Sequence, residues 1–294
     1  MKNTKIKLSK KAWIAILIIS VAVLLICVFF IVKPYLWPDP NDEISRDDFL
    51  RDKSAQSDVT TPVEPATPDE PTEGVTEPPT EAPTINSFGY ELEDAMNWED
   101  VDFGKLNNIN PDIYAWLYVP GTNVDYPVAQ SMRDRDDSFY LSHNIYREYQ
   151  FSGTIYSEVK NSIDFHDPVT LLYGHNMLNG SMFATLHYFS DEDFFNKHTT
   201  MFVQTKDKLY TYLIYAAYVY DDRHILNSFD FSNEEVRMNY FNYTLNPRTY
   251  SGFVREGVKL DKDSNILTLS TCTNGGGNTR YLVQGVLVDE QLRS

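Results

Sequence analysis

Cys272 and Arg280 stand on either side of a glycine-rich loop near the C-terminal end of the chain. The apolar run 266–271 predicts a β-strand that ends at the cysteine, and 281–288 predicts a strand that begins just after the arginine. This arrangement places a thiol and a guanidinium near each other at one end of a sheet. A thiolate is a nucleophile and a guanidinium can stabilise a developing oxyanion, so the pair could carry nucleophilic chemistry.

A cysteine nucleophile needs a lowered pKa or an adjacent base, and histidine is the usual partner. His175 has the most suggestive setting, because it follows an apolar strand predicted at 169–173 and a glycine, and should lie exposed at the end of that strand. His143, in the sequence Leu-Ser-His-Asn, is its main competitor. The remaining histidines lie in turn, loop or amphipathic-helix contexts that favour a structural role: His166, His187, His198 and His224.

The two cysteines exclude a disulfide framework. Cys27 lies within a long apolar run far from Cys272, so the two cannot pair. A buried cysteine that acts as a small hydrophobic side chain is the alternative interpretation of Cys272, although its polar, glycine-rich surroundings disfavour it. The scattered histidines lack metal-ligand spacing, and no Gly-Lys-Ser/Thr follows the glycines. We therefore predict no metal site, no phosphate loop and no cofactor.

The apolar run predicts a membrane anchor. Residues 13–32 are almost all apolar, and twenty helical residues cover about 30 Å, the thickness of the hydrocarbon core of a bilayer. Lysines precede the run and acidic residues follow it, an asymmetry that keeps the N-terminus in the cytoplasm. We expect a basic cytoplasmic tail at 1–11, a single transmembrane helix at 12–33, and an extracytoplasmic remainder.

The part of the chain beyond the anchor is acidic. The net charge is −17, and residues 1–37 contribute six positive charges and no negative ones, so the remainder carries −23. Such a surface repels a phosphate backbone, which argues against nucleic-acid binding. Residues 34–86 consist largely of Thr, Pro, Glu and Asp, a composition that predicts a disordered linker able to tether a domain at a distance from the bilayer.

Residues 87–294 form the predicted folded domain. A helical section is expected around 88–96, and a second short helix at 100–106. Further helices are expected at 182–189, at 191–196 and from Ser232 to about Tyr243. Strands are expected at 114–119, 124–128, 154–157, 169–173, 201–204, 209–219, 266–271 and 281–288. Eight short strands with few helices predict a mainly β fold, an eight-stranded closed β-barrel.

Two motifs in this domain together resemble the sortases, membrane-anchored cysteine transpeptidases of Gram-positive surfaces. One is Thr-Leu-Ser-Thr-Cys, which ends at Cys272 with Arg280 downstream, and the other is Tyr-Gly-His-Asn-Met around His175. The similarity runs through most of 110–290. The helix placed before the cysteine strand and the N-terminal helices resemble class B in particular. The chain has no obvious Asp-Pro-aromatic lid before the barrel, which departs from the pilin-polymerising class C.

The resemblance implies a role for each motif residue. Cys272 would attack the carbonyl after the threonine of an LPXTG- or NPXTX-like sorting signal, and His175 would protonate the leaving amine. Arg280 and the backbone N–H of Thr273 would hold the tetrahedral oxyanion. Positions that line the peptide groove in the family fall on Leu141, Tyr173 and Ser270. The expected partners are sorting-signal-bearing surface proteins and the amine of a peptidoglycan precursor, with the membrane as the site of anchoring.

Other interpretations of the same residues stay open. A pilin-linking sortase or a cysteine peptidase would use the same triad. A non-catalytic extracytoplasmic binding module would leave Cys272 merely buried. Only the enzymes would form a thioester on this cysteine, and an added amine would then separate transfer from hydrolysis.

Overall fold

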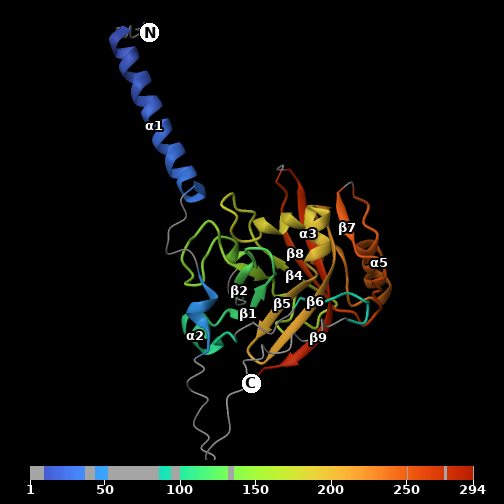
Figure 1. Ribbon diagram of the computed structural model, residues 1–294. Coiled ribbons are helices and arrows are strands. Elements are labelled where there is room, and N and C mark those ends of the chain that lie inside the picture. The colour runs from blue at the N-terminus through green and yellow to red at the C-terminus, as the bar shows by residue number, and fades with distance from the viewer. Residues whose placement is uncertain are drawn as a thin grey trace, which may run out of the picture.

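A single mixed sheet forms the body of the protein in the computed structural model, which describes residues 10–36, 44–51, 86–93, 100–131, 136–249, 251–274 and 277–293. The strand order is β5-β1-β2-β3-β4-β8-β9-β6, and β5 also pairs with β6, so the eight strands close into a barrel (Figure 1). These strands are β1 (Ile113–Tyr118), β2 (Asp125–Gln130), β3 (Ile155–Ser157), β4 (Val169–Tyr173), β5 (Thr200–Thr205), β6 (Lys208–Asp221), β8 (Ile266–Cys272) and β9 (Thr279–Leu292). The predicted mainly β, closed eight-stranded fold is confirmed, with each strand within a few residues of its expected place.

A ninth strand that the sequence did not predict extends the sheet outside the barrel. Strand β7 (Gly252–Val254) is three residues long and pairs with 216–218 of β6. It takes the edge of β6 that β5 leaves free, because β5 ends its pairing at Leu213. A segment of three residues is too short to show an alternating pattern, so only the tertiary pairing defines it.

The alternation of side chains along the strands separates the two faces of the barrel wall. Leu172, Leu269 and Tyr281 point inward and belong to the interior core. Their neighbours Leu171 and Leu282 belong to a second core on the outer face. Because successive strand residues point to opposite faces, the pattern assigns every other residue of β4, β8 and β9 to the outside.

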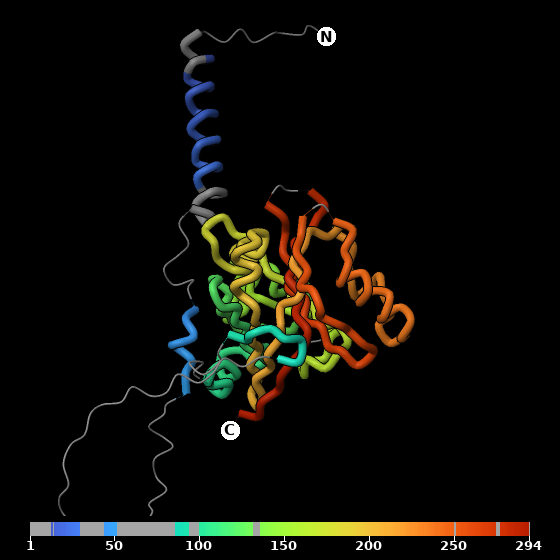
Figure 2. The backbone as a smooth tube through the Cα atoms, turned by 45° about the vertical axis from the view of Figure 1, so that its right-hand side comes forward, coloured from blue at the N-terminus to red at the C-terminus, as the bar shows by residue number. Residues whose placement is uncertain are grey.

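Helix α5 (Glu234–Leu245) covers part of this outer face (Figures 1 and 2). Asn233 caps it, since its side chain accepts a hydrogen bond from the backbone N–H of Val236. Tyr240 and Phe241 are buried in the same core as the outward residues of β4, β8 and β9. The predicted helix before the cysteine strand is therefore confirmed. The other helices around the barrel are α2 (Phe103–Ile109), η4 (Phe139–Leu141), η5 (Ala184–Ser190), α3 (Glu192–Lys197) and α4 (Ile225–Ser228).

Three expected helices differ from the structure. The short helix expected at 100–106 is α2, Phe103–Ile109, which begins three residues later because Asp102 caps it. The helix expected to begin at 182 begins at Ala184 as a 3-10 helix, because Met182 has a φ of +55° and forms a bridge with Asn176. Within the helical section expected at 88–96, residues 86–93 form a turn and an extended segment, and 94–99 lie outside the described residues. The side chain of Asn86 accepts hydrogen bonds from the backbone N–H groups of residues 88 and 90, which replaces the helical pattern.

Part of the predicted linker packs against the barrel. Residues 44–51 include the 3-10 helix η2 (Arg46–Phe49), which lies beside α2 in Figures 1 and 2. Phe49 is buried, and its ring lies 6.0 Å from that of Trp116 on β1. Leu50 forms a bridge with Val101. The expectation of a disordered stretch over all of 34–86 is wrong for these residues, because the barrel offers them an apolar surface, and 52–85 lie outside the described residues.

The predicted membrane anchor coincides with helix α1 (Lys10–Leu36), whose described side chains, at 13 and 15–29, are exposed. Among the described residues, no helix is both long enough and apolar enough to cross a membrane. The single transmembrane helix expected at 12–33 is therefore not confirmed.

The packing of η2 leads to a stability prediction. Phe49→Ala should lower the free energy of unfolding by about 3 kcal/mol, because it removes a buried ring and leaves a cavity against Trp116. Chemical denaturation followed by tryptophan fluorescence measures this change. Asp48→Ala is the matched control, since Asp48 is exposed and should shift stability by less than about 0.5 kcal/mol. Equal stability of the two variants would contradict the docking of this segment.

Candidate active site

Three adjacent strands bring the predicted residues to one end of the sheet: Cys272 ends β8, Arg280 is near the start of β9, and His175 follows the end of β4 by two residues. In the antiparallel pair β8–β9, Cys272 is the register partner of Arg280. In the parallel pair β4–β8, Tyr173 is the partner of Ser270, and the backbone N–H of Gly174 donates to the carbonyl of Ser270 at 3.2 Å. His175 lies two residues beyond Tyr173, just after the end of β4, and Cys272 lies two residues beyond Ser270 on β8, so the three predicted residues come together in a row at this end of the sheet.

The row lies on the outer face of the barrel wall. Cys272 follows Ser270 on β8 by two residues, and Arg280 precedes Leu282, an outward residue of β9, by two. His175 lies just beyond the end of β4, where its ring contacts Leu141 and Phe151. Cys272 is exposed and its thiol is free, whereas His175 and Arg280 are partly buried. The alternative of a buried cysteine that only fills space is therefore wrong.

The imidazole of His175 is held by two contacts. Its Nε2 lies 2.8 Å from the backbone carbonyl of Leu141, and a carbonyl can only accept, so Nε2 carries the proton. In the neutral ring, Nδ1 is then the nitrogen able to accept a proton. The ring also stacks on Phe151, with 5.3 Å between centroids. Partial burial lowers the pKa of His175, and the hydrogen bond to Leu141 opposes this shift without cancelling it.

Arg280 and Thr273 present donors beside the thiol. The Arg280 guanidinium donates from Nη1 to the carbonyl of Thr279 at 3.2 Å, and no carboxylate among the described residues forms an ion pair with it. The hydroxyls of Thr273 and Thr279 lie 2.7 Å apart, which joins the two ends of the glycine-rich loop. Within the described parts of the chain, no acceptor meets the backbone N–H of Thr273. The N–H of Thr273 and the remaining N–H groups of Arg280 therefore have no acceptor among the described residues, and both lie near Cys272.

Two side chains that the sequence did not single out hold the backbone of Cys272. Its carbonyl accepts hydrogen bonds from Nδ2 of Asn176 at 3.1 Å and from Nε2 of His187 at 3.0 Å. That carbonyl and the N–H of Thr273 belong to the same peptide group. The two donors therefore fix the orientation of the Thr273 N–H, and they polarise it through the amide. Nδ2 of Asn176 also donates to Asn274 at 2.7 Å.

The other histidines lie outside the row. His143, the main competitor, uses Nδ1 to bind the carbonyl of Phe139 at 2.7 Å and stacks on the Phe139 ring. His166, His198 and His224 each pair with a glutamate elsewhere on the domain. No group of three potential metal ligands gathers among the described residues. The strand register thus favours His175 as the partner of Cys272.

The three predicted groove residues lie next to the row. Tyr173 and Ser270 are register partners on the same outer face. Leu141 is 40% exposed and contacts His175 through its backbone carbonyl. Their position beside the thiol is compatible with a peptide groove, while their role in binding stays a prediction.

The environment of His175 leads to a pH prediction. Its pKa should lie below the ordinary value of 6.5, because the folded protein disfavours the charged ring. The contribution of His175 to the free energy of unfolding should therefore decrease as pH falls from 6.5, the pKa of the unfolded state, towards the lower pKa of the folded state. An NMR titration of the ring measures the midpoint. Phe151→Ala should raise it towards 6.5 by exposing the ring, whereas Tyr149→Ala, an exposed aromatic that contacts His143 instead, should not. A midpoint above 6.5 would contradict this description.

Comparisons with known proteins agree with this geometry. A family model described as the sortase domain matches residues 117–288. Sortase B of Listeria monocytogenes is 32% identical over 185 residues, which cover 62% of this chain and 72% of that protein.

Solved structures give the same result. Sortase B of Clostridium perfringens has a TM-score of 0.58 at 34% identity, covering 64% of this chain and all of the other. A class B sortase of Streptococcus pyogenes involved in pilus biogenesis has a TM-score of 0.52 at 29% identity, covering 63% of this chain and 97% of the other. The chain belongs to the sortase domain family and is a class B-like sortase, a cysteine transpeptidase.

Proposed function

We propose that this sortase cleaves an LPXTG- or NPXTX-like sorting signal through a thioester on Cys272 and joins the surface protein to an amine of cell-wall peptidoglycan. The observation that carries the proposal is the row of His175, Cys272 and Arg280 at the neighbouring ends of β4, β8 and β9. It sets a nucleophile between a base and a cation, as acyl transfer requires.

In the first half-reaction the sulfur of Cys272 attacks the carbonyl carbon of the signal. The thiol proton passes to Nδ1 of His175, since Nε2 already donates to Leu141. Collapse of the tetrahedral intermediate breaks the C–N bond, and His175 returns the proton to the leaving amine. In the second half-reaction, the incoming amine attacks the thioester carbonyl and gives a proton to His175. The departing sulfur then recovers a proton, so the enzyme returns to its starting state.

Arg280 and the N–H of Thr273 hold the negative oxygen of each tetrahedral intermediate. Both are donors beside Cys272, and both lack a competing carboxylate among the described residues. Asn176 and His187 serve as positioning residues, because they bind the carbonyl of the peptide group that carries the Thr273 N–H. Donors fixed before the reaction need no reorganisation when the charge develops.

Membrane anchoring is part of the proposal. Its support is the apolar run at 13–32, preceded by lysines, and the acidic linker that would carry the domain away from the bilayer. The domain would then lie outside the membrane, where sorting signals and peptidoglycan precursors meet. Pilin linking is a second candidate, favoured by the Streptococcus pyogenes relative, a class B sortase involved in pilus biogenesis.

The triad roles can be tested in one assay. Incubation with a sorting-signal peptide should leave an acyl adduct on Cys272, detected by mass spectrometry, and Cys272→Ala should abolish it. His175→Ala should slow acylation by about 10²–10⁴-fold, and Arg280→Ala by about 10²–10³-fold.

His143→Ala is the matched control and should stay within about twofold of the wild type, because His143 lies outside the row. If His143→Ala abolished the adduct and His175→Ala did not, the assignment of the base would be wrong. Addition of an amine should convert the adduct to a transfer product faster than water hydrolyses it, whereas a peptidase would show the reverse. A pilin subunit that accepts the acyl group in preference to a peptidoglycan fragment would favour the second candidate.

The positioning roles predict a different kinetic signature. His187→Phe should lower kcat by about tenfold with little change in KM for the signal peptide, because it removes one donor from the Cys272 carbonyl. His187→Gln keeps an N–H donor and should recover most of that loss. If His187 acted only through packing, His187→Phe should keep its activity and His187→Gln should lose it. Phenylalanine would preserve the ring contact with Tyr281, and glutamine would not.

A further inference from the structure

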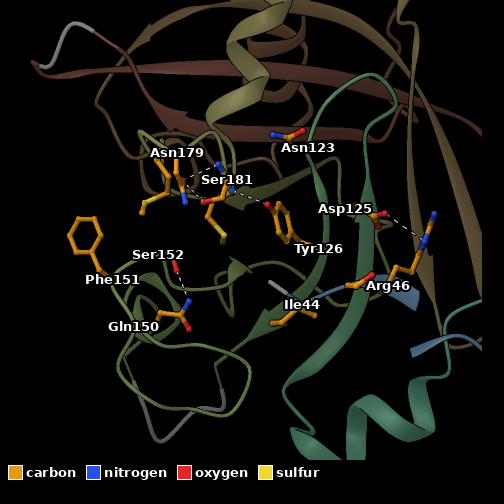
Figure 3. Close-up of a pocket in the computed structure, with 13 residues that line it drawn as sticks. Ile44, Arg46, Asn123, Asp125, Tyr126, Gln150, Phe151, Ser152, Asn179 and Ser181 are labelled. Atoms are coloured by element: carbon orange, nitrogen blue, oxygen red, sulfur yellow. Dashed lines mark hydrogen bonds and ion pairs between the residues drawn. The ribbon is translucent and has the colours of Figure 1, made fainter. Parts of the chain in front are cut away.

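A cavity of about 530 Å³ lies beside the active site, on the His175 side, and its size is that of a ligand pocket. Phe151, which stacks on the His175 ring, lines one end, and the ion pair of Arg46 with Asp125 lines the other (Figure 3). Tyr126 lies between them. The cavity and the base are therefore neighbours, because the ring of Phe151 lines the cavity and also contacts His175.

The strand order fixes the side of Cys272 on which this cavity lies. In the order β2-β3-β4-β8-β9, Asp125 and Tyr126 are on β2, His175 follows β4, Cys272 ends β8 and Arg280 is on β9. The cavity and Arg280 are thus on opposite sides of the thiol. Any group bound in the cavity approaches Cys272 past His175.

The chemistry of the proposed reaction assigns this side to amines. His175 gives a proton to the leaving amine and takes one from the incoming amine, so microscopic reversibility brings both amines to the same side of the acyl carbon. After acylation the leaving fragment departs, and this side is open to the acceptor. A pocket that begins at Phe151, on the side of His175 away from Arg280, is in the right place for the remainder of the acceptor molecule.

The lining suits a peptide. Amides and hydroxyls that both donate and accept hydrogen bonds dominate it: Asn123, Gln150, Ser152, Asn179 and Ser181. The thioethers of Met177 and Met182 add adaptable apolar surface. Such a lining matches the alternating donors and acceptors of a peptide backbone. The charged groups of the lining, Arg46 and Asp125, pair with each other at the far end, 3.6 Å apart.

Hydrogen bonds hold the walls of the cavity in place. Nδ2 of Asn123 donates to the carbonyl of Gly180 at 3.1 Å, and the backbone N–H of Met182 donates to the Tyr126 hydroxyl at 3.1 Å. These bonds tie the loop after His175 to β2 and to the turn before it. Ile44, Ser45 and Arg46, from the segment that the sequence assigned to the linker, complete the wall.

From this geometry we propose that the cavity binds the acceptor substrate, a peptide that presents a primary amine to His175, and that the segment 44–46 forms part of the acceptor site. The inference rests on the proposed function, because it assigns the second substrate of that reaction. Residues 44–46, the docked part of the tether, would then contribute directly to binding of the acceptor.

The test separates the acceptor from the sorting signal. Ser152→Trp and Ser45→Trp fill the cavity from two separate segments of its lining, and Ser228→Trp places the same side chain at an exposed serine on α4 as a control. The full chain is acylated with a sorting-signal peptide, and transfer is measured to triglycine and to hydroxylamine. Triglycine is a peptidyl amine that would occupy the cavity, whereas hydroxylamine is too small to need it. If the wild type does not use triglycine, an Nα-acetylated lysine amide replaces it.

Both cavity variants should raise KM for the peptidyl amine by about tenfold or more. Thioester formation and transfer to hydroxylamine should stay within about twofold of the wild type and of Ser228→Trp. Unchanged KM in both variants would overturn the proposal. Slowed thioester formation would also overturn it, because the cavity would then hold the leaving fragment. Thermal unfolding checks that each variant folds, and the two segments give independent tests. A wild-type chain that forms no thioester would instead contradict the proposed function.

Discussion

The parallel hydrogen bonding of β4 to β8 is the constraint on which the site depends. It brings His175 to the same end of the sheet as Cys272, while the antiparallel pairing of β8 with β9 sets Arg280 opposite the same cysteine. His175 is distant in sequence from Cys272 and Arg280, and the pairing of β4 with β8 brings it beside them. A register shift of one residue would turn the cysteine to the inner face of the barrel. The extensive cores on both faces therefore preserve the register as well as the fold.

The peptide group between Cys272 and Thr273 is the second feature on which the proposed chemistry depends. Its carbonyl receives two side-chain donors, and its N–H faces no competing acceptor among the described residues. Asn176 and His187 come from the segment that follows β4, as does His175. One stretch of chain thus supplies the candidate base and the groups that orient the candidate oxyanion donor. The hydrogen bonds from Asn176 and His187 to the Cys272 carbonyl therefore attach the segment after β4 to the end of β8.

The sequence was sufficient for most of the barrel and for the row of three residues. Alternating apolar residues located the eight strands, and the cysteine and arginine around a glycine-rich loop indicated their proximity. Residue patterns could not reveal the role of His187, because its position on a short helix says nothing about which backbone carbonyl the ring reaches. The docking of Phe49 was equally hidden, since its partner Trp116 is distant in sequence and its neighbours resemble a linker. Asn86 replaced an expected helix with a turn through a local side-chain bond that competes with the helical pattern.

A crystal structure of the enzyme with a sorting-signal analogue bound covalently to Cys272 would show whether Thr273 and Arg280 hold the oxyanion and whether His175 serves the amines. We expect the carbonyl oxygen of the adduct to lie within hydrogen-bond distance of the Thr273 N–H and the Arg280 guanidinium. We also expect Nδ1 of His175 to face the acyl carbon from the opposite side, with Nε2 still bound to Leu141. An adduct oxygen directed away from both donors, or a His175 ring turned from the acyl carbon, would contradict these roles.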